Sequence, residues 1–173
     1  DREMADLKKV RQYRYLELID APPAERMQAR DPVAEANDIF ADANRLYERN
    51  RRVPMVFDKD ELRIALEKFR RLIKEYPTSD KVDDACFYTA EILKEFFDES
   101  AQAVEYYRLA YQADPNTPHP AHFQRAVILD FRLYRRDEAV QEYRAVLAKD
   151  NDPAGFRAKS NKDFAATRIK QLT

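Results

Sequence analysis

Apolar residues recur at spacings of three and four along most of the chain, which is the period of a helix with one buried face. The pattern is clearest in SAQAVEYYRLAYQADP, residues 100–115, where Ala103, Tyr107 and Ala110 share a face and Pro115 follows. Proline cannot continue the helical hydrogen-bond ladder, so we expect a helix to stop there. The same periodicity predicts helices at about 33–50, 60–75, 80–97, 100–113, 119–134 and 137–149.

Three segments repeat this pattern and superimpose without gaps: ALEKFRRLI (65–73), AVEYYRLAY (103–111) and AVQEYRAVL (139–147). Each has an alanine, an aromatic residue four positions later, and then an arginine. These positions are Ala65, Ala103 and Ala139; Phe69, Tyr107 and Tyr143; and Arg70, Arg108 and Arg144. Successive alanines lie 38 and 36 residues apart, which indicates a structural unit that repeats.

A second set of segments precedes these: FADANRL (40–46), FYTAEIL (87–93) and FQRAVIL (123–129), each with Phe, Ala three residues on, and Leu three further. An alanine at a helix crossing lets two backbones approach closely. We therefore predict an all-α fold of three repeated helical hairpins, with alanines at the helix contacts and aromatic residues between neighbouring hairpins. The composition agrees, because an all-β fold needs many tight turns and the chain has one glycine, Gly155.

Composition narrows the functional classes. Hydrophobic residues make up 45% and charged residues 36% of the 173 residues, as in a folded globular chain. The 31 Lys and Arg against 32 Asp and Glu leave no basic excess for nucleic acid. No apolar run is long enough to span a membrane, and no glycine-rich loop of the nucleotide-binding kind is present. The lone cysteine, Cys86, excludes an internal disulfide.

The repeated alanine, the aromatic residue four positions later and the following Pro77 or Pro115 resemble the tetratricopeptide repeat. The segment KFRRLIKEYPTSDKVDDACFYTAE (68–91) is similar to repeats of bacterial envelope proteins of this family, such as the β-barrel assembly lipoprotein and the Tol-associated periplasmic coordinator. The resemblance implies a right-handed superhelical stack of three hairpins with flanking N- and C-terminal helices. It also implies a scaffold for protein–protein interaction, periplasmic or associated with the outer membrane.

This sequence departs from the family pattern at several positions. The consensus tryptophan is missing, and alanine replaces the consensus glycine at Ala43, Ala90 and Ala126. The third unit has Asn151 where proline is expected, and the first hairpin carries an insertion, RRVPMVFDKD (51–60). These departures leave the repeat class in place but do not support transfer of a known ligand.

The predicted organisation has three parts. Residues 1–32 form an N-terminal helix (2–19) and a proline-containing linker. Residues 33–150 form the hairpins, at about 33–77, 80–115 and 119–150, and residues 151–173 form a capping segment. A capping segment is expected because a stack of hairpins exposes an apolar face at each end. We expect Ala166 and Ile169 to seal the third hairpin, and Asp60, Ser79, Ser100 and Asp137 to cap helix N-termini.

The candidates for chemistry are few. His119 and His122, with a third ligand from Asp114 or Asp130, suggest a metal site, but no cluster of the usual zinc type completes it. An ordinary N-terminal helical turn explains them better. Cys86 shares a face with Ala90 and is expected to be a buried thiol. The arginine row is either paired with acids one turn earlier, such as Glu67 and Glu105, or a phosphate-binding stripe. We predict no catalytic residue, metal or cofactor, and hence no enzyme.

Stacked hairpins form a curved surface, and the first helix of each hairpin lines its concave side. A helical wheel places one flank of each first helix there, and we call these positions the first-helix flank. They are Asn37, Asn44 and Tyr47 in the first hairpin; Asp84, Phe87, Glu91 and Lys94 in the second; and Phe123, Val127, Asp130 and Phe131 in the third. We expect the flank to form a partner-binding groove that is polar at one end and apolar at the other.

The apolar end of the first-helix flank needs a cover, because a large exposed apolar patch is unusual on a monomer. The chain's own C-terminal segment, a partner peptide and a second copy of the chain are the alternatives. Co-chaperone members of the family clamp a C-terminal carboxylate with basic and asparagine residues. This flank has three acids against Lys94, so that function is not carried over.

Two functions fit these observations. The first is an adaptor that binds a protein or peptide in the concave groove, and the second is a structural subunit that assembles into a homo-oligomer. A metal-dependent or phosphate-binding protein is a distant third.

Overall fold

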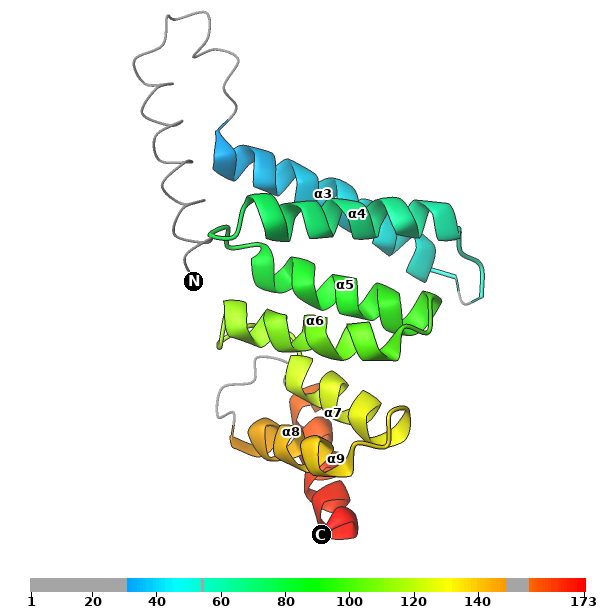
Figure 1. The fold of residues 1–173 in the computed structure, drawn as a ribbon, viewed down its shortest axis with the longest axis vertical. Coiled ribbons are helices and arrows are strands. Elements are labelled where there is room, and N and C mark those ends of the chain that lie inside the picture. Colours follow the sequence, from blue (N-terminus) through cyan, green and yellow to red (C-terminus); the bar gives the residue numbers. More distant parts are fainter. Residues whose placement is uncertain (1–30, 54, 149–155) are drawn as a thin grey trace, which may run out of the picture. The chain divides into compact units, whose positions relative to one another are not determined.

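The computed structural model describes residues 31–53, 55–148 and 156–173. Every regular element in these residues is an α-helix, which confirms the predicted fold class (Figure 1). The helices are α3 (Pro32–Arg51), α4 (Lys59–Glu75), α5 (Val82–Phe96), α6 (Ser100–Ala113), α7 (Ala121–Phe131), α8 (Arg136–Ala148) and α9 (Phe156–Leu172). The chain divides into two compact units, Asp1–Glu35 and Ala36–Thr173. The predicted helix over 2–19 and its linker lie outside the described residues.

Helices adjacent in sequence are adjacent in space within the second unit. From α4 to α9, each helix packs against the next one along the chain. The chain reverses direction at each connection between α3 and α8 (Figure 1). Ring contacts join α3 to each of the next two helices. The ring centroids of Phe40 and of Phe69 on α4 lie 5.7 Å apart, and those of Tyr47 and of Tyr88 on α5 lie 5.4 Å apart.

The alanines that define the repeat are all buried. Ala65, Ala103 and Ala139 have 0% of their surface exposed, and so do their counterparts on the preceding helices, Ala43, Ala90 and Ala126. The aromatic residues four positions later, Phe69, Tyr107 and Tyr143, are equally buried. The predicted burial of these positions is therefore confirmed. Small side chains here leave room for close helix contact, and the large rings fill the space beside them.

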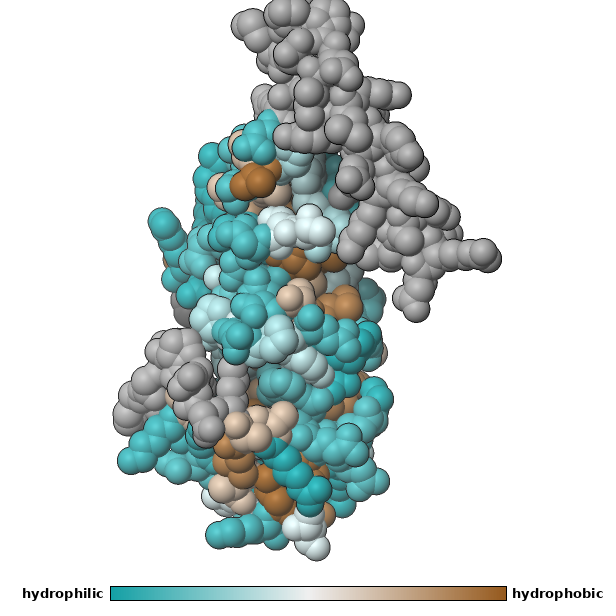
Figure 2. Space-filling model, turned by 90° about the vertical axis from the view of Figure 1, so that its left-hand side faces the viewer, coloured by the Kyte–Doolittle hydropathy of each residue, from teal (hydrophilic) through white to brown (hydrophobic). Residues whose placement is uncertain are grey.

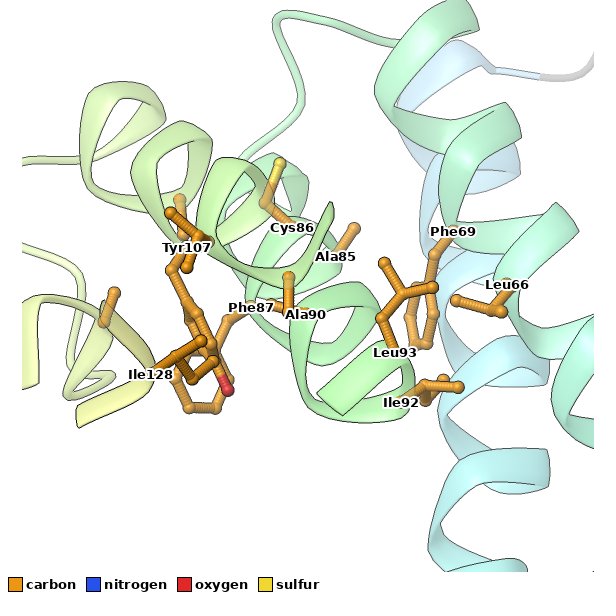
Figure 3. Close-up of a cluster of buried hydrophobic side chains, with 14 of the residues drawn as sticks. Leu66, Phe69, Ala85, Cys86, Phe87, Ala90, Ile92, Leu93, Tyr107 and Ile128 are labelled. Carbon is orange, nitrogen blue, oxygen red and sulfur yellow. The ribbon is translucent and has the colours of Figure 1, made fainter. Parts of the chain in front are cut away.

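Helix α5 supplies much of the central core (Figure 3). Its Leu93 points toward Leu66 and Phe69 of α4, whereas Tyr107 of α6 and Ile128 of α7 lie on the other side (Figure 3). Because α5 is covered by both neighbours, a polar residue on it needs an internal partner. Thr89 finds one within its own helix, where its hydroxyl donates to the Ala85 carbonyl over 2.7 Å.

The helix stops agree with the sequence, but the predicted N-caps are wrong. Pro77 and Pro115 follow the C-cap residues Tyr76 and Asp114. Helix α4 is capped by Asp58, not Asp60, and Asp58 Oδ1 accepts from the Asp60 and Glu61 N–H groups over 2.8 and 3.2 Å. The other N-caps also differ: Lys81, not Ser79, precedes α5; Ser100 lies inside α6 after Glu99; and Asp137 lies in the first turn of α8. Acidic residues stabilise a helix both at the N-cap and in the first turn, so the residue type alone does not show which of the two positions it occupies.

The connections inside the three hairpins share one backbone feature. Each contains a non-glycine residue with positive φ: Met55 at 65°, Asp98 at 57° and Tyr134 at 56°. After Asp98 and Tyr134, the next N–H bonds back to the carbonyl six residues earlier, Glu99 to Leu93 over 2.9 Å and Arg135 to Leu129 over 2.7 Å. Helices often end in a glycine with left-handed backbone angles. Here Asp98 and Tyr134 adopt that conformation instead, as expected in a chain with one glycine.

Candidate functional site

The first-helix flank lies where the first helices of the hairpins and α9 contact one another. Tyr47 of α3 contacts Phe96 as well as Tyr88 of α5, with a centroid distance of 6.5 Å to Phe96. Phe87 of α5 stacks on the His119 ring, 4.2 Å away and nearly parallel, just before α7. Phe123 of α7 lies 5.7 Å from Phe164 of α9. Aromatic contacts therefore connect α3, α5, α7 and α9 along this side.

The polar residues of the second hairpin are bound within the chain. Lys94 has 8% of its surface exposed, and its Nζ lies 2.8 Å from Glu91 Oε1 and 3.0 Å from Gln124 Oε1. Glu91 also accepts a hydrogen bond from the Tyr107 hydroxyl. Asp84 Oδ1 lies 2.6 Å from His119 Nε2. A buried charge must be paired to be tolerated, so these contacts hold α5 against its neighbours.

Burial keeps the tyrosine hydroxyls of this region protonated. It raises the pKa of Tyr47 to about 12, with a further contribution from the negative charge of Glu91. Burial and Glu91 likewise raise the pKa of Tyr107 well above its ordinary value. The Tyr107 hydroxyl is therefore a permanent donor to Glu91 at neutral pH.

The apolar end of the flank is covered by the chain's own C-terminal helix. Arg168 of α9 donates two hydrogen bonds of 2.8 Å to the carboxylate of Asp130, which also accepts from the Tyr143 hydroxyl over 3.2 Å. Phe131 lies 6.4 Å from Phe164, and the Arg168 guanidinium lies 4.7 Å from the Phe131 ring centroid. Of the three alternatives that the sequence left open, the structure shows the chain's own C-terminal helix on this end. The cover is partial, because Phe131 keeps 47% of its surface exposed. Val127 packs half-buried against the core.

One detail of this cover was predicted wrongly. The fully buried alanine of α9 is Ala165, with 0% exposed, whereas Ala166 is only partly buried. Ile169 packs against the core as expected. The prediction was off by one residue because periodicity alone does not define the rotation of a helix that has little apolar surface.

The first hairpin differs from the other two. Asn37 is exposed, and Asn44 carries a buried side-chain oxygen, Oδ1, with no hydrogen-bond partner among the residues that the structure describes. Asn44 shares a face of α3 with Phe40 and Tyr47, one turn away on either side. Both rings contact Tyr88, at 6.1 and 5.4 Å. This part of the flank therefore combines packed aromatic rings with an acceptor for which the described residues supply no donor.

The sequence missed several residues that build this face. The Tyr88 ring makes contacts between α5 and the rings of α3. Phe164 and Arg168 are the α9 residues that pack on the apolar end of the flank. Tyr88 follows Phe87 directly, but it is not one of the positions that the three Phe–Ala–Leu segments share. No periodic signal marks Arg168, because its partner Asp130 lies 38 residues away.

The histidines face separate carboxylates. His122 Nδ1 lies 2.7 Å from Glu142 Oε2, and its ring stacks on Tyr111 at 3.8 Å. A small pocket bounded by α7, α8 and α9 is lined by both histidines and Phe123. Among the described residues, no group of three His, Cys, Asp or Glu side chains is placed to hold a metal ion. The ligand set considered from the sequence is not brought together, since Asp130 binds Arg168 and Asp114 accepts from the Asn116 N–H over 2.8 Å.

The arginine row does not form a common anion site. Arg70 donates to the Tyr106 hydroxyl over 3.1 Å and to Gln102 Oε1 over 3.3 Å, both on α6, and not to Glu67. Arg108 pairs with Glu105 over 2.9 Å, as expected. Cys86 is also as predicted: it has 1% exposed surface, and burial raises its pKa to about 12.

Two further observations bear on function. Among the described helices, none is long and apolar enough to cross a bilayer. No known protein family matches the chain, and no curated protein matches it.

Proposed function

We propose that the protein is a non-catalytic scaffold of the tetratricopeptide repeat type that binds a protein or peptide partner along the first-helix flank. The observation that carries the proposal is the equivalent burial of the three alanine–aromatic pairs, one in each hairpin. Repeated hairpins of this kind build an extended surface suited to a partner chain. By the resemblance of residues 68–91, we place this role in the bacterial envelope.

The first hairpin is the part of the flank best suited to a partner. In the second and third hairpins, the polar residues of the flank form hydrogen bonds with each other's hairpin or with α9. Asn44 Oδ1 has no such partner in the described residues. A buried acceptor without a donor costs about 1–3 kcal/mol, and a peptide N–H would recover that energy once the Asn44 side chain turns outward toward the partner. We propose that an extended partner segment crosses Asn44 and the rings of Phe40 and Tyr88.

A peptide selection tests this proposal directly. A displayed library of random peptides is selected on the immobilised protein, and the affinity of the recovered peptides is measured by fluorescence polarisation. We expect Asn44→Ala to weaken binding about fivefold, the effect of one hydrogen bond. The same substitution leaves the free energy of unfolding unchanged or raises it, because it removes a buried acceptor that lacks a donor.

The matched control is Asn116→Ala, in the exposed connection between α6 and α7, which leaves both quantities unchanged. Recovered peptides that bind Asn44→Ala and wild type equally would place the binding site elsewhere. Failure to recover any peptide, together with a stable oligomer by light scattering at all concentrations, would favour the structural subunit instead.

A further inference from the structure

The connection between α3 and α4 exposes a run of apolar side chains. Val53, Met55, Val56 and Phe57 have 55, 94, 67 and 40% of their surface exposed. They belong to the insertion that distinguishes the first hairpin from the other two. Exposed apolar residues are ordinary when they are scattered, but four such residues close together in one loop require an explanation.

Basic residues directly precede this run. Arg49, Arg51 and Arg52 fall within residues 49–57, which contain no acidic residue. Arg49 is held by Glu61, and Arg51 lies 3.3 Å from Glu48 with about half of its side chain exposed. Arg52 is exposed. The Arg51 guanidinium also lies 5.6 Å from the Tyr47 ring centroid. The apolar tip is therefore bordered by the exposed Arg52 before it and by the exposed Asp58 after it.

The base of the loop is held firmly while its tip points outward. The Asn50 side chain accepts from the Asp58 N–H over 2.6 Å and donates to Glu61 over 2.8 Å. The Phe57 ring lies 5.1 Å from Phe96 of α5. These contacts fix both ends of the connection, so exposure of Met55 and Val56 does not arise from a loose attachment.

The loop shares one edge of the second unit with the other two hairpin connections, at the right of Figure 1. The α5–α6 connection is acidic, with Glu95, Asp98 and Glu99. The α7–α8 connection shares the apolar and basic character, with Arg132 and Arg135 beside Tyr134, which has 74% of its surface exposed. The α3–α4 loop differs from it in exposing four apolar side chains close together. On the opposite edge, shown in Figure 2, hydrophilic residues predominate and hydrophobic ones form separate patches.

We propose that the α3–α4 loop docks the protein on the surface of an anionic lipid bilayer. Val53, Met55 and Val56 enter the interfacial layer, and Arg51 and Arg52 bind lipid phosphates. Exposed apolar side chains can insert into the deformable headgroup region of a bilayer. A guanidinium group can donate two hydrogen bonds to one phosphate. This mode needs no spanning helix and is independent of the partner site at Asn44.

Vesicle flotation tests the proposal. The full chain is floated with vesicles of phosphatidylglycerol and phosphatidylcholine, and with phosphatidylcholine alone. We expect binding to the anionic vesicles that weakens as salt is raised. Arg52→Glu lowers the partition coefficient about tenfold or more, and Met55→Asp abolishes flotation. The control Arg144→Glu makes the same change in net charge on exposed α8 surface and keeps wild-type binding.

A fluorescence measurement adds a second readout, because the chain contains no tryptophan. Trp emission from Met55→Trp shifts to shorter wavelength on addition of anionic vesicles, whereas emission from Leu147→Trp does not. Met55 has 94% of its surface exposed, so substitutions there do not disturb the core, and circular dichroism checks that the variants keep their helix content. Absence of wild-type flotation at low salt, equal binding to neutral vesicles, or an unshifted emission at position 55 overturns the proposal and leaves a protein contact as the role of the loop.

Discussion

Arg168 on α9 and Asp130 on α7 are joined by two parallel hydrogen bonds, each 2.8 Å long. Asp130 has 4% of its surface exposed, so this guanidinium is the charge that makes burial of the carboxylate tolerable. The pair ties the last helix to the first helix of the third hairpin, across the apolar end of the first-helix flank. Access to that end therefore depends on whether α9 stays in place.

Loss of this pair is expected to release α9. Arg168→Gln removes the charge from a buried carboxylate and lowers the free energy of unfolding by about 2 kcal/mol. Hydrogen exchange should rise first in α9, before the core of α5 and α6. Lys170→Gln, on the exposed side of the same helix, is the control and leaves both measurements near wild type. Uniformly faster exchange across all helices would show that α9 is not an independently releasable element.

The close approach of helices at the repeated alanines can be tested by replacing an alanine with a larger residue. Ala103 is fully buried, whereas Ala101, two residues earlier on α6, is exposed. Ala103→Leu forces extra volume into a packed contact and lowers the free energy of unfolding by about 1–3 kcal/mol in denaturant titration. Ala101→Leu changes it by less than about 0.5 kcal/mol. Equal effects of the two substitutions would contradict the helix contact at Ala103.

Glu142 makes the third hairpin sensitive to acid. Burial raises the pKa of its carboxyl, but hydrogen bonds and positive charge from His122 and Arg125 outweigh burial and hold the pKa below its ordinary value of 4.5. A carboxyl with a lowered pKa in the folded state contributes stability above the ordinary value, and this contribution is lost as pH falls through the lowered one.

The expected result is a difference in slope. Below the ordinary pKa, the free energy of unfolding of wild type should fall more steeply with acid than that of Glu142→Gln, measured by urea titration at each pH. The two curves should run parallel at neutral pH, with the variant less stable because Arg125 has lost its buried partner. Glu67→Gln, an exposed position on α4, should keep the wild-type slope. Parallel curves for Glu142→Gln through the acid range would contradict the assignment.

Local patterns in the sequence account for much of the fold. The helical period, the repeated alanines and aromatic residues, and the stops before Pro77 and Pro115 were all predicted and all observed. They could be predicted because a buried helical face and a proline stop depend on residues a few positions apart. The N-caps were missed by one or two residues, since capping depends on backbone angles that composition does not specify.

The candidate site depended far more on tertiary structure. The sequence placed Asp84, Lys94 and Asp130 on one flank of the first helices, and it left the cover of the apolar end undecided. Their partners are His119, Gln124 and Arg168, which lie between 30 and 38 residues away. Helical periodicity carries no information about such pairs, because they form only when separate hairpins come together. The sequence by itself therefore determined the helices and their buried faces. The packing of one hairpin on the next decided which polar groups are paired and that Asn44 Oδ1 has no partner in the described part of the chain.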